Sequence, residues 1–183
     1  SSAASDVYKR QGVVVVAKSA KAQYALTRSH DLIHREYIAV AGGYIPGEFG
    51  IVDAPIGRKE GSIIEWTVRK DGKPARTEYT VLRHGDNYTV LKLHLLTGRT
   101  HQIRVHMSSL GCSLIGDQVY EKAKKSGLRF RTEAEKNAVL TFPRQALHAA
   151  TLGFVHPVSG KELRFHSDFP EDMARLLRVL RGG

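Results

Sequence analysis

Cysteine is almost absent from this 183-residue sequence. A single thiol, Cys112, cannot form an internal disulfide or a cysteine-cluster metal site, so these two kinds of framework are excluded. No stretch reaches the roughly 18 consecutive apolar residues that a membrane-spanning helix requires. We therefore expect a protein of the reducing cytoplasm that does not bind a membrane.

Motifs of several common catalytic classes are also missing. The sequence has no G-x-G-x-x-G, no phosphate-binding loop and no G-x-S-x-G turn, which removes support for nucleotide cofactors and serine hydrolases. Nine histidines are present, but His101 and His106 fall on different helix faces, and no H-E-x-x-H occurs. His148 is expected to be a core histidine. The sequence predicts neither a metal nor a cofactor.

Acidic residues are scarce relative to basic ones. Lysine and arginine number 28 against 18 aspartates and glutamates, which gives a net charge of +10. Such an excess favours a polyanionic partner, most often a nucleic acid. A basic surface without any such partner explains the charge about as well, so the charge alone does not decide.

The pattern from Gly12 onward alternates between strands and helices. The apolar run Val13–Ala17 predicts a buried strand, and Ser19 is a possible N-cap for the helix after it. Further strands are expected at 35–43, 62–70, 75–84, 87–96, 151–156 and 162–167, with 62–70 paired to 75–84 and 151–156 paired to 162–167. Helices are expected at 100–110 and 170–181, with a charged, partly helical surface insertion at 121–138. The sequence predicts an α+β fold with a mixed, largely antiparallel sheet core flanked by helices.

The first eleven residues differ in pattern from the rest of the chain. They are small and polar, show no periodicity and stop abruptly at the first strand pattern. We interpret residues 1–11 as a non-native or artefactual tail and residues 12–183 as the domain. A short disordered tail is the alternative.

The stretch LLTGRTHQIRVHMSSLG, residues 95–111, places bases where a helix begins. Arg99, His101 and Arg104 lie in or beside the first turn, and no acid accompanies them. A helix N-terminus carries partial positive charge, so acids are favoured there and bases cost stability. These bases therefore require a negative partner.

Two interpretations of Arg104 remain open. A buried stripe on another face of this helix is predicted from the i, i+4, i+7 spacing of Ile103, Met107 and Leu110. Arg104 is therefore directed away from the stripe. It either binds an anion in a functional site or forms a structural pair with a core acid such as Asp117.

Several separated segments together resemble the RluA/RluD-type pseudouridine synthases. They are LLTGRTHQIRVHMSSLGCSLIGDQVY, HREYIAV, DGKPARTEY and FPRQALHAATLGFVHPVSGKEL, in the family's order. The resemblance implies a cofactor-independent isomerase that converts uridine in structured RNA to pseudouridine. The base is flipped out, its N-glycosidic bond is broken, and the ring is rejoined through C5. The implied partner is RNA, ribosomal ahead of transfer RNA, and we expect a monomer.

The same resemblance implies roles for individual residues. Arg104 would form an ion pair with the family's catalytic aspartate, and Tyr37 would stack on the flipped base. On its own surroundings in the sequence, Tyr37 also fits a core tyrosine with a hydrogen-bonded hydroxyl. Arg99, His101 and Arg35 are expected to contact RNA.

The catalytic aspartate itself has no counterpart at its expected place. It belongs to an H-R-L-D-x-x-T-S-G type motif whose final glycine matches Gly12, and counting back five positions gives Val7, with Asp6 one position off. We therefore predict a truncated synthase domain that is inactive as written. The alternative is a basic RNA-binding module without catalysis, while the placement of Arg104 disfavours a merely structural protein.

Overall fold

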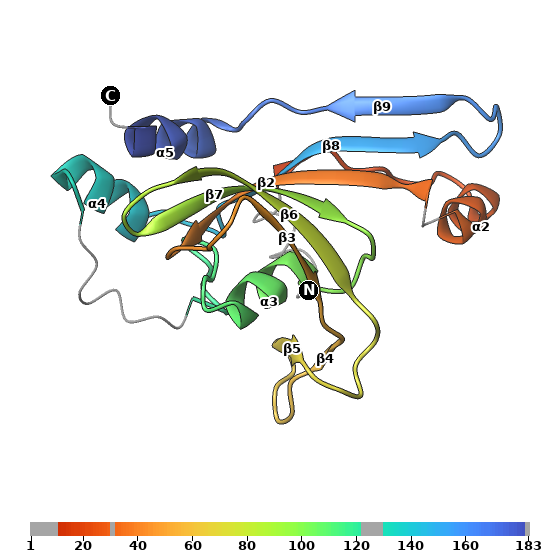
Figure 1. Ribbon diagram of the computed structural model, residues 1–183. Helices are drawn as coiled ribbons and strands as arrows, with labels where there is room; N and C mark the ends of the chain where they lie inside the picture. Colours follow the sequence, from red (N-terminus) through yellow and green to blue (C-terminus); the bar gives the residue numbers. More distant parts are fainter. Residues whose placement is uncertain (1–10, 30–31, 122–129, 182–183) are drawn as a thin grey trace.

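A seven-stranded sheet forms the centre of the protein (Figure 1). The structure is a computed structural model, and it describes residues 11–29, 32–121 and 130–181. The sheet has the order β1-β8-β2-β7-β6-β3, with β9 also paired to β8; β1 runs parallel to β8 and the other pairs are antiparallel. Its strands are β1 (Gln11–Gly12), β2 (His34–Gly42), β3 (Phe49–Asp53), β6 (Arg76–His84), β7 (Tyr88–Leu95), β8 (Leu147–Val155) and β9 (Glu162–His166).

Helices and a small hairpin cover the two faces of this sheet. The hairpin consists of β4 (Ile56–Arg58) and β5 (Trp66–Val68). The helices are α2 (Ala20–Arg28), α3 (Gln102–Ser109), α4 (Glu133–Leu140) and α5 (Glu171–Arg181). Helix α3 and the hairpin lie on one face, and α4 and α5 lie on the other (Figure 1). The predicted α+β class is confirmed.

Each face of the sheet has its own apolar core. On the α3 side, Ile103 and Met107 of the helix join Leu91 and Leu93 of β7. On the α5 side, the buried residues include Met173, Leu176 and Leu180 of the helix together with Val40 and Val90 of the sheet. Alternate residues of β2 and β7 therefore serve opposite cores, as the two-residue period of a strand requires.

Most predicted elements occur close to their expected places. Ser19 caps α2 by accepting the N–H of Ala22 at 3.2 Å, and α3 begins and ends within two residues of its predicted bounds. The pairing of β8 with β9 confirms the hairpin predicted near the C-terminus. Of the charged insertion predicted at 121–138, α4 supplies the helical part, and residues 122–129 lie outside the described part of the chain.

The buried strand predicted at Val13–Ala17 is wrong. Pairing with β8 ends after Gly12, apart from one bond from the N–H of Val13 to the carbonyl of Ala149 (3.0 Å). Val14 and Val16 are 77% and 75% exposed. Strand β9 pairs with the same edge of β8 from Thr151 onward, so the apolar run cannot continue along that edge.

Two further expectations are corrected. Segment 62–70 does not pair with 75–84, because β5 pairs with β4, and Lys73 and Ile56 exchange backbone hydrogen bonds that return the chain to β4. Leu110 is 42% exposed and does not complete the buried stripe, because α3 ends at Ser109 and the periodicity of the helix ends with it.

Candidate active site

The N-terminus of α3 is anchored by a buried glutamine. The side-chain carbonyl of Gln102 accepts hydrogen bonds from the hydroxyl of Thr97 (2.7 Å) and the N–H of Arg99 (3.0 Å). Its amide donates to the carbonyl of Arg76 and the hydroxyl of Thr77, both at 2.9 Å. The loop before the helix is thus fixed to β6.

The residue directly before α3 has an unusual backbone. His101 adopts φ +55° in the left-handed region, which costs about 1–2 kcal/mol for a side chain with a Cβ. Its imidazole Nδ1 lies 2.9 Å from the hydroxyl of Tyr120. Backbone strain of this kind gathers at functional sites, where surrounding contacts hold it in place.

The negative partner of the helix is Asp117. Arg104 donates from Nε and Nη2 to the two carboxylate oxygens of Asp117, each at 2.7 Å, and Asp117 is 1% exposed. The N–H groups of Val119 and Tyr120 donate to the same carboxylate at 3.0 and 3.1 Å. The sequence left Arg104 open between a functional anion site and a structural pair; the structure shows that Asp117 is a partner of Arg104, and this contact alone does not assign the role.

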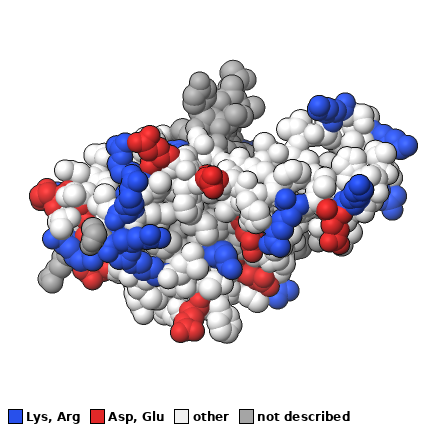
Figure 2. Space-filling view, turned by 90° about the horizontal axis from the view of Figure 1, so that it is seen from above, with Lys and Arg blue, Asp and Glu red and all other residues white. Residues whose placement is uncertain are grey.

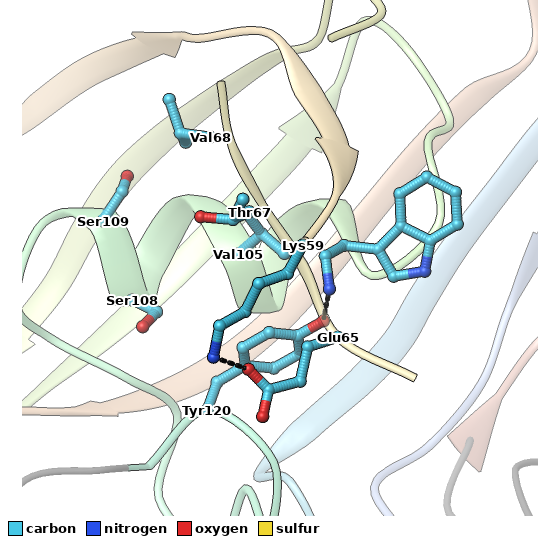
Figure 3. A pocket seen from close by; sticks show the side chains of 9 residues that line it. Lys59, Glu65, Thr67, Val68, Val105, Ser108, Ser109 and Tyr120 are labelled. Carbon is cyan, nitrogen blue, oxygen red and sulfur yellow. Dashed lines mark hydrogen bonds and ion pairs between the residues drawn. The ribbon is translucent and has the colours of Figure 1, made fainter. Parts of the chain in front are cut away.

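The same guanidinium lies over the phenol ring of Tyr120. The carbon at the centre of the Arg104 guanidinium lies 4.9 Å from the ring centroid, within the range of a cation–π contact. The hydroxyl accepts the N–H of Trp66 at 2.9 Å, which ties the site to the β4–β5 hairpin (Figure 3). Asp117 therefore binds one edge of the Arg104 guanidinium, and the group lies over the ring of Tyr120.

A pocket of about 230 Å³ lies between the hairpin and α3. Tyr120 lines it together with Ser108, one helical turn beyond Arg104, and an ion pair joins Lys59 to Glu65 across it at 2.5 Å (Figure 3). The pocket is lined by both polar and apolar side chains, including hydroxyl groups and the Lys59–Glu65 ion pair.

The protonation states at this site follow from burial and charge. Burial alone would raise the pKa of Asp117, but the hydrogen bonds and charge of Arg104, with two backbone N–H groups, outweigh it and lower that pKa. Burial raises the pKa of Tyr120. At neutral pH the site therefore holds an ionised Asp117, a cationic Arg104 and a neutral phenol.

Tyr37 lies on β2 at an irregular point of the sheet. The register between β2 and β8 shifts between Glu36 and Tyr37, and such bulges re-aim side chains and occur often next to active sites. Tyr37 packs against the same core cluster to which Ile103 of α3 contributes. The candidate stacking residue and the helix of Arg104 therefore border one core.

Gly12 lies on β1 at the level of Tyr37, because both residues pair with Ala149 of β8. At Gly12, φ is +115° and a Cβ would lie 2.2 Å from the carbonyl oxygen of Ala149, so only glycine fits. This requirement supports matching Gly12 to the final glycine of the aspartate motif. Val7 and Asp6 lie outside the described residues.

The other predicted contact residues occupy different settings. Arg99 is exposed and donates from Nε to the carbonyl of Pro74 at 2.8 Å. Arg35 is half-buried on β2, two residues before Tyr37, and His101 is half-buried before α3. The structure thus brings His101 to the Arg104 site through Tyr120, and it places Arg35 with Tyr37 on β2.

The core histidines make internal hydrogen bonds. Both ring nitrogens of His106 are engaged, Nδ1 with the hydroxyl of Thr77 at 2.8 Å and Nε2 with the carbonyl of Ala54 at 2.9 Å. Burial lowers the pKa of His106. His148 is buried, as expected for a core histidine, and its Nε2 lies 2.9 Å from the carbonyl of Ser167. Its buried Nδ1 has no hydrogen-bond partner among the described residues, so the expected full satisfaction of this histidine is not seen.

Sequence reasoning missed the roles of Gln102 and Tyr120. The signal for Tyr120 was present, because it stands three residues after Asp117 in G-D-x-x-Y, and this spacing lets both residues meet Arg104. The role of Gln102 had no signal, since its four partners come from the preceding loop and from β6.

Comparison with known proteins identifies the family and the fold. The model of the RNA pseudouridylate synthase family matches residues 8–109. The chain belongs to the RNA pseudouridylate synthase family. The ribosomal large subunit pseudouridine synthases D of Nitrosomonas europaea and Escherichia coli K12 are 43% and 42% identical over 172 residues, which is 93% of this chain. The chain spans about half the length of these curated relatives, 48% and 52%.

Solved structures of human family members share the fold. Human RNA pseudouridylate synthase domain containing 1 has a TM-score of 0.64 and 25% identity, covering 92% of this chain and 74% of its own. Human RNA pseudouridylate synthase domain containing 4 has a TM-score of 0.65 with 22% identity, which shows the fold alone. In the described residues of this synthase-family chain, no helix is long and apolar enough to cross a membrane.

Proposed function

We propose that this chain is the uridine-isomerising domain of a synthase that acts on ribosomal RNA. The observation that carries the proposal is the rigidly held Arg104 at the N-terminus of α3, within a chain of this family. A guanidinium fixed on one edge by Asp117 can present other N–H donors to a second carboxylate. Tyr37 would stack on the flipped uracil. Ribosomal RNA as substrate is supported by the names of the relatives.

The proposed reaction rearranges bonds within one uridine. The bond between N1 of uracil and C1′ of ribose breaks, a bond between C5 and C1′ forms, and the hydrogen leaves C5 while N1 gains one. Atoms balance without an oxidant or reductant. We propose that Arg104 keeps the catalytic carboxylate ionised and oriented. Val7 stands at the aspartate position in the motif register, so the chain as written lacks that carboxylate.

The surface charge supports RNA as the partner. On the face shown in Figure 2, lysines and arginines form a band at the side of α4 and α5. Exposed arginines of α5 include Arg175 and Arg178. Phosphate contacts of this kind position RNA without reading its sequence. We expect Arg99, His101 and Arg35 to add contacts nearer to the site; a monomeric state and a cytoplasmic location also remain predictions.

Restoring the aspartate motif tests the proposal. The restored chain carries A4H, S5R, D6L, V7D, R10T and Q11S, which completes H-R-L-D-x-x-T-S-G ending at Gly12. Its substrate is ribosomal RNA tritiated at C5 of uridine, from cells that lack their own synthases. We expect tritium release from the restored chain, and background release from the chain as written and from a matched control with V7N in place of V7D.

Two outcomes contradict parts of this proposal. Release by the chain as written at the rate of the restored chain would show that Val7 is not at the aspartate position. RNA binding by the restored chain without any release would favour the non-catalytic RNA-binding module instead.

A further inference from the structure

The side chains around Arg104 raise a question that the proposed reaction does not answer. Asp117 is buried, ionised and bidentate with Arg104, and so would compete for the arginine that should serve a catalytic carboxylate. An arginine neutralised by a buried partner is commonly a structural element. The details of the contact separate these roles.

Asp117 engages only one edge of the guanidinium. It accepts from Nε and from one N–H of Nη2, whereas a guanidinium carries five N–H donors, so three N–H groups are not engaged by Asp117. The guanidinium carbon also lies over the ring of Tyr120, 4.9 Å from its centroid. The two-bond contact with Asp117 and the contact with the ring together restrict the position of Arg104.

The two holding residues are themselves rigid. The carboxylate of Asp117 accepts the N–H groups of Val119 and Tyr120, so the short segment carrying both residues closes on itself. The hydroxyl of Tyr120 accepts the N–H of Trp66 and lies 2.9 Å from His101. The holding residues are therefore anchored to the β4–β5 hairpin and to the residue that starts α3.

We propose that Asp117 and Tyr120 are positioning residues that hold Arg104, by two hydrogen bonds and by contact with an aromatic ring, in the place where it meets the catalytic carboxylate of the uridine-isomerising reaction. This inference rests on the proposed function, because the carboxylate that Arg104 serves belongs to that reaction. A positioning group set within about half an ångström of the productive geometry affects turnover more than substrate affinity. Asp117 therefore acts through Arg104 and does not touch the RNA.

The first test measures the hold on Arg104 in the chain as written. Arginine side chains labelled with ¹⁵N give Nε–H signals, and R104K identifies the signal of Arg104 by removing it. We expect D117N to shift or broaden that signal at a temperature where the variant is folded. D172N is the matched control, because Asp172 holds a different arginine, Arg144, by the same two-bond geometry. An unchanged Arg104 signal in D117N overturns the proposal.

The second test measures turnover in the restored chain. We expect D117N to lower kcat about tenfold to a hundredfold with RNA affinity within about threefold, and to move the acid limb of the pH–rate profile upward. Y120L should lower kcat about tenfold, and Y120F, which keeps the ring, should recover most of that loss. D172N should leave kcat and the pH profile unchanged.

The outcomes separate this inference from the proposed function. Normal turnover and an unshifted pH profile in restored D117N overturn the positioning role while the isomerase proposal stands. Equal losses in D117N and D172N show a general stability effect and overturn it as well. If the restored chain itself releases no tritium, the proposed function fails. The Nε–H signal of Arg104 then still decides whether Asp117 holds Arg104.

Discussion

Two arginine–aspartate pairs lie on opposite faces of the sheet and share one geometry. Arg104 meets Asp117 at 2.7 and 2.7 Å on the α3 side, and Arg144 meets Asp172 of α5 at 2.8 and 2.8 Å on the other. Each arginine also lies over an aromatic ring, that of Tyr120 at 4.9 Å or that of Phe142 at 5.5 Å. The distances within the pairs do not distinguish them.

Their surroundings do distinguish them. Nη1 of Arg144 donates to the carbonyls of Gln145 and Leu147, both at 3.1 Å, so this guanidinium fastens the start of β8 to α5. The side chain of Asp172 is 34% exposed, whereas that of Asp117 is 0% exposed. Arg104 instead stands in the first turn of α3, over the ring of Tyr120, and Tyr120 lines a pocket. The comparison teaches that the role of an ion pair is set by its neighbours, and it makes Arg144 an internal control.

Removal of each arginine should give the largest contrast. In the restored chain, R104A should lower turnover about a hundredfold or more, because each 1.36 kcal/mol of lost transition-state stabilisation is tenfold in rate. R144A should lower the free energy of unfolding and leave kcat near that of the parent at a temperature where it is folded. Tritium release measures both rates.

The conservative replacement sharpens the same contrast. R104K should recover little turnover, since an ammonium cannot make the two-bond contact with Asp117. Near-normal turnover of R104A would make Arg104 a phosphate clamp or a residue of the fold, and the two pairs would then be equivalent.

Removal of each acid should give a smaller contrast in stability. D117N leaves a buried guanidinium without its counter-charge and should cost about 3 kcal/mol of unfolding free energy. D172N should cost about 1 kcal/mol, because the partly exposed site lets water replace the lost charge. Urea unfolding at neutral pH measures both; equal costs would show that burial does not separate the pairs.

The pH dependence of these costs has a definite sign. Against the effect of burial, Arg104 lowers the pKa of Asp117 and Arg144 lowers that of Asp172 below the ordinary 3.8. Such groups contribute stability above the ordinary pKa, and this stability is lost as pH falls through the folded-state pKa. The difference between parent and D117N should therefore shrink below about pH 4. A difference that stays constant into acid would contradict the lowered pKa of Asp117.

The smallest effect concerns the exposed arginines on the α5 side. The chain as written should bind RNA weakly and without strong sequence preference, with an affinity that falls steeply between about 50 and 200 mM salt. R175A combined with R178A should reduce the salt slope by about one unit for each phosphate that these arginines neutralise. Fluorescence titration of labelled RNA gives both values. Salt-independent binding would contradict the RNA interpretation of the net charge.

The sequence predicted the fold class and the placement of Arg104 because both depend on local patterns. Periodicity located β2, β7 and α3, and the absence of acids before Arg104 indicated a partner elsewhere. The sequence could not predict which segment would pair with the outer edge of β8. Val13–Ala17 is apolar enough for a strand, but β9 occupies that edge. The G-D-x-x-Y spacing indicated that Tyr120 lies near Asp117, but its hydrogen bond from the backbone N–H of Trp66 depends on the hairpin fold, which the side-chain pattern does not encode.

The thirteen positions that separate Arg104 from Asp117 bear on how the site assembles during folding. Closing so short a loop costs little chain entropy, and contacts of low sequence separation form early. One continuous segment, residues 101–120, can therefore build the electrostatic half of the site as a local unit. Tyr37 joins only when β2 has paired with β7 and β8, across far longer loops. The two halves of the site are therefore expected to form at different stages, with the charge in place before the aromatic surface.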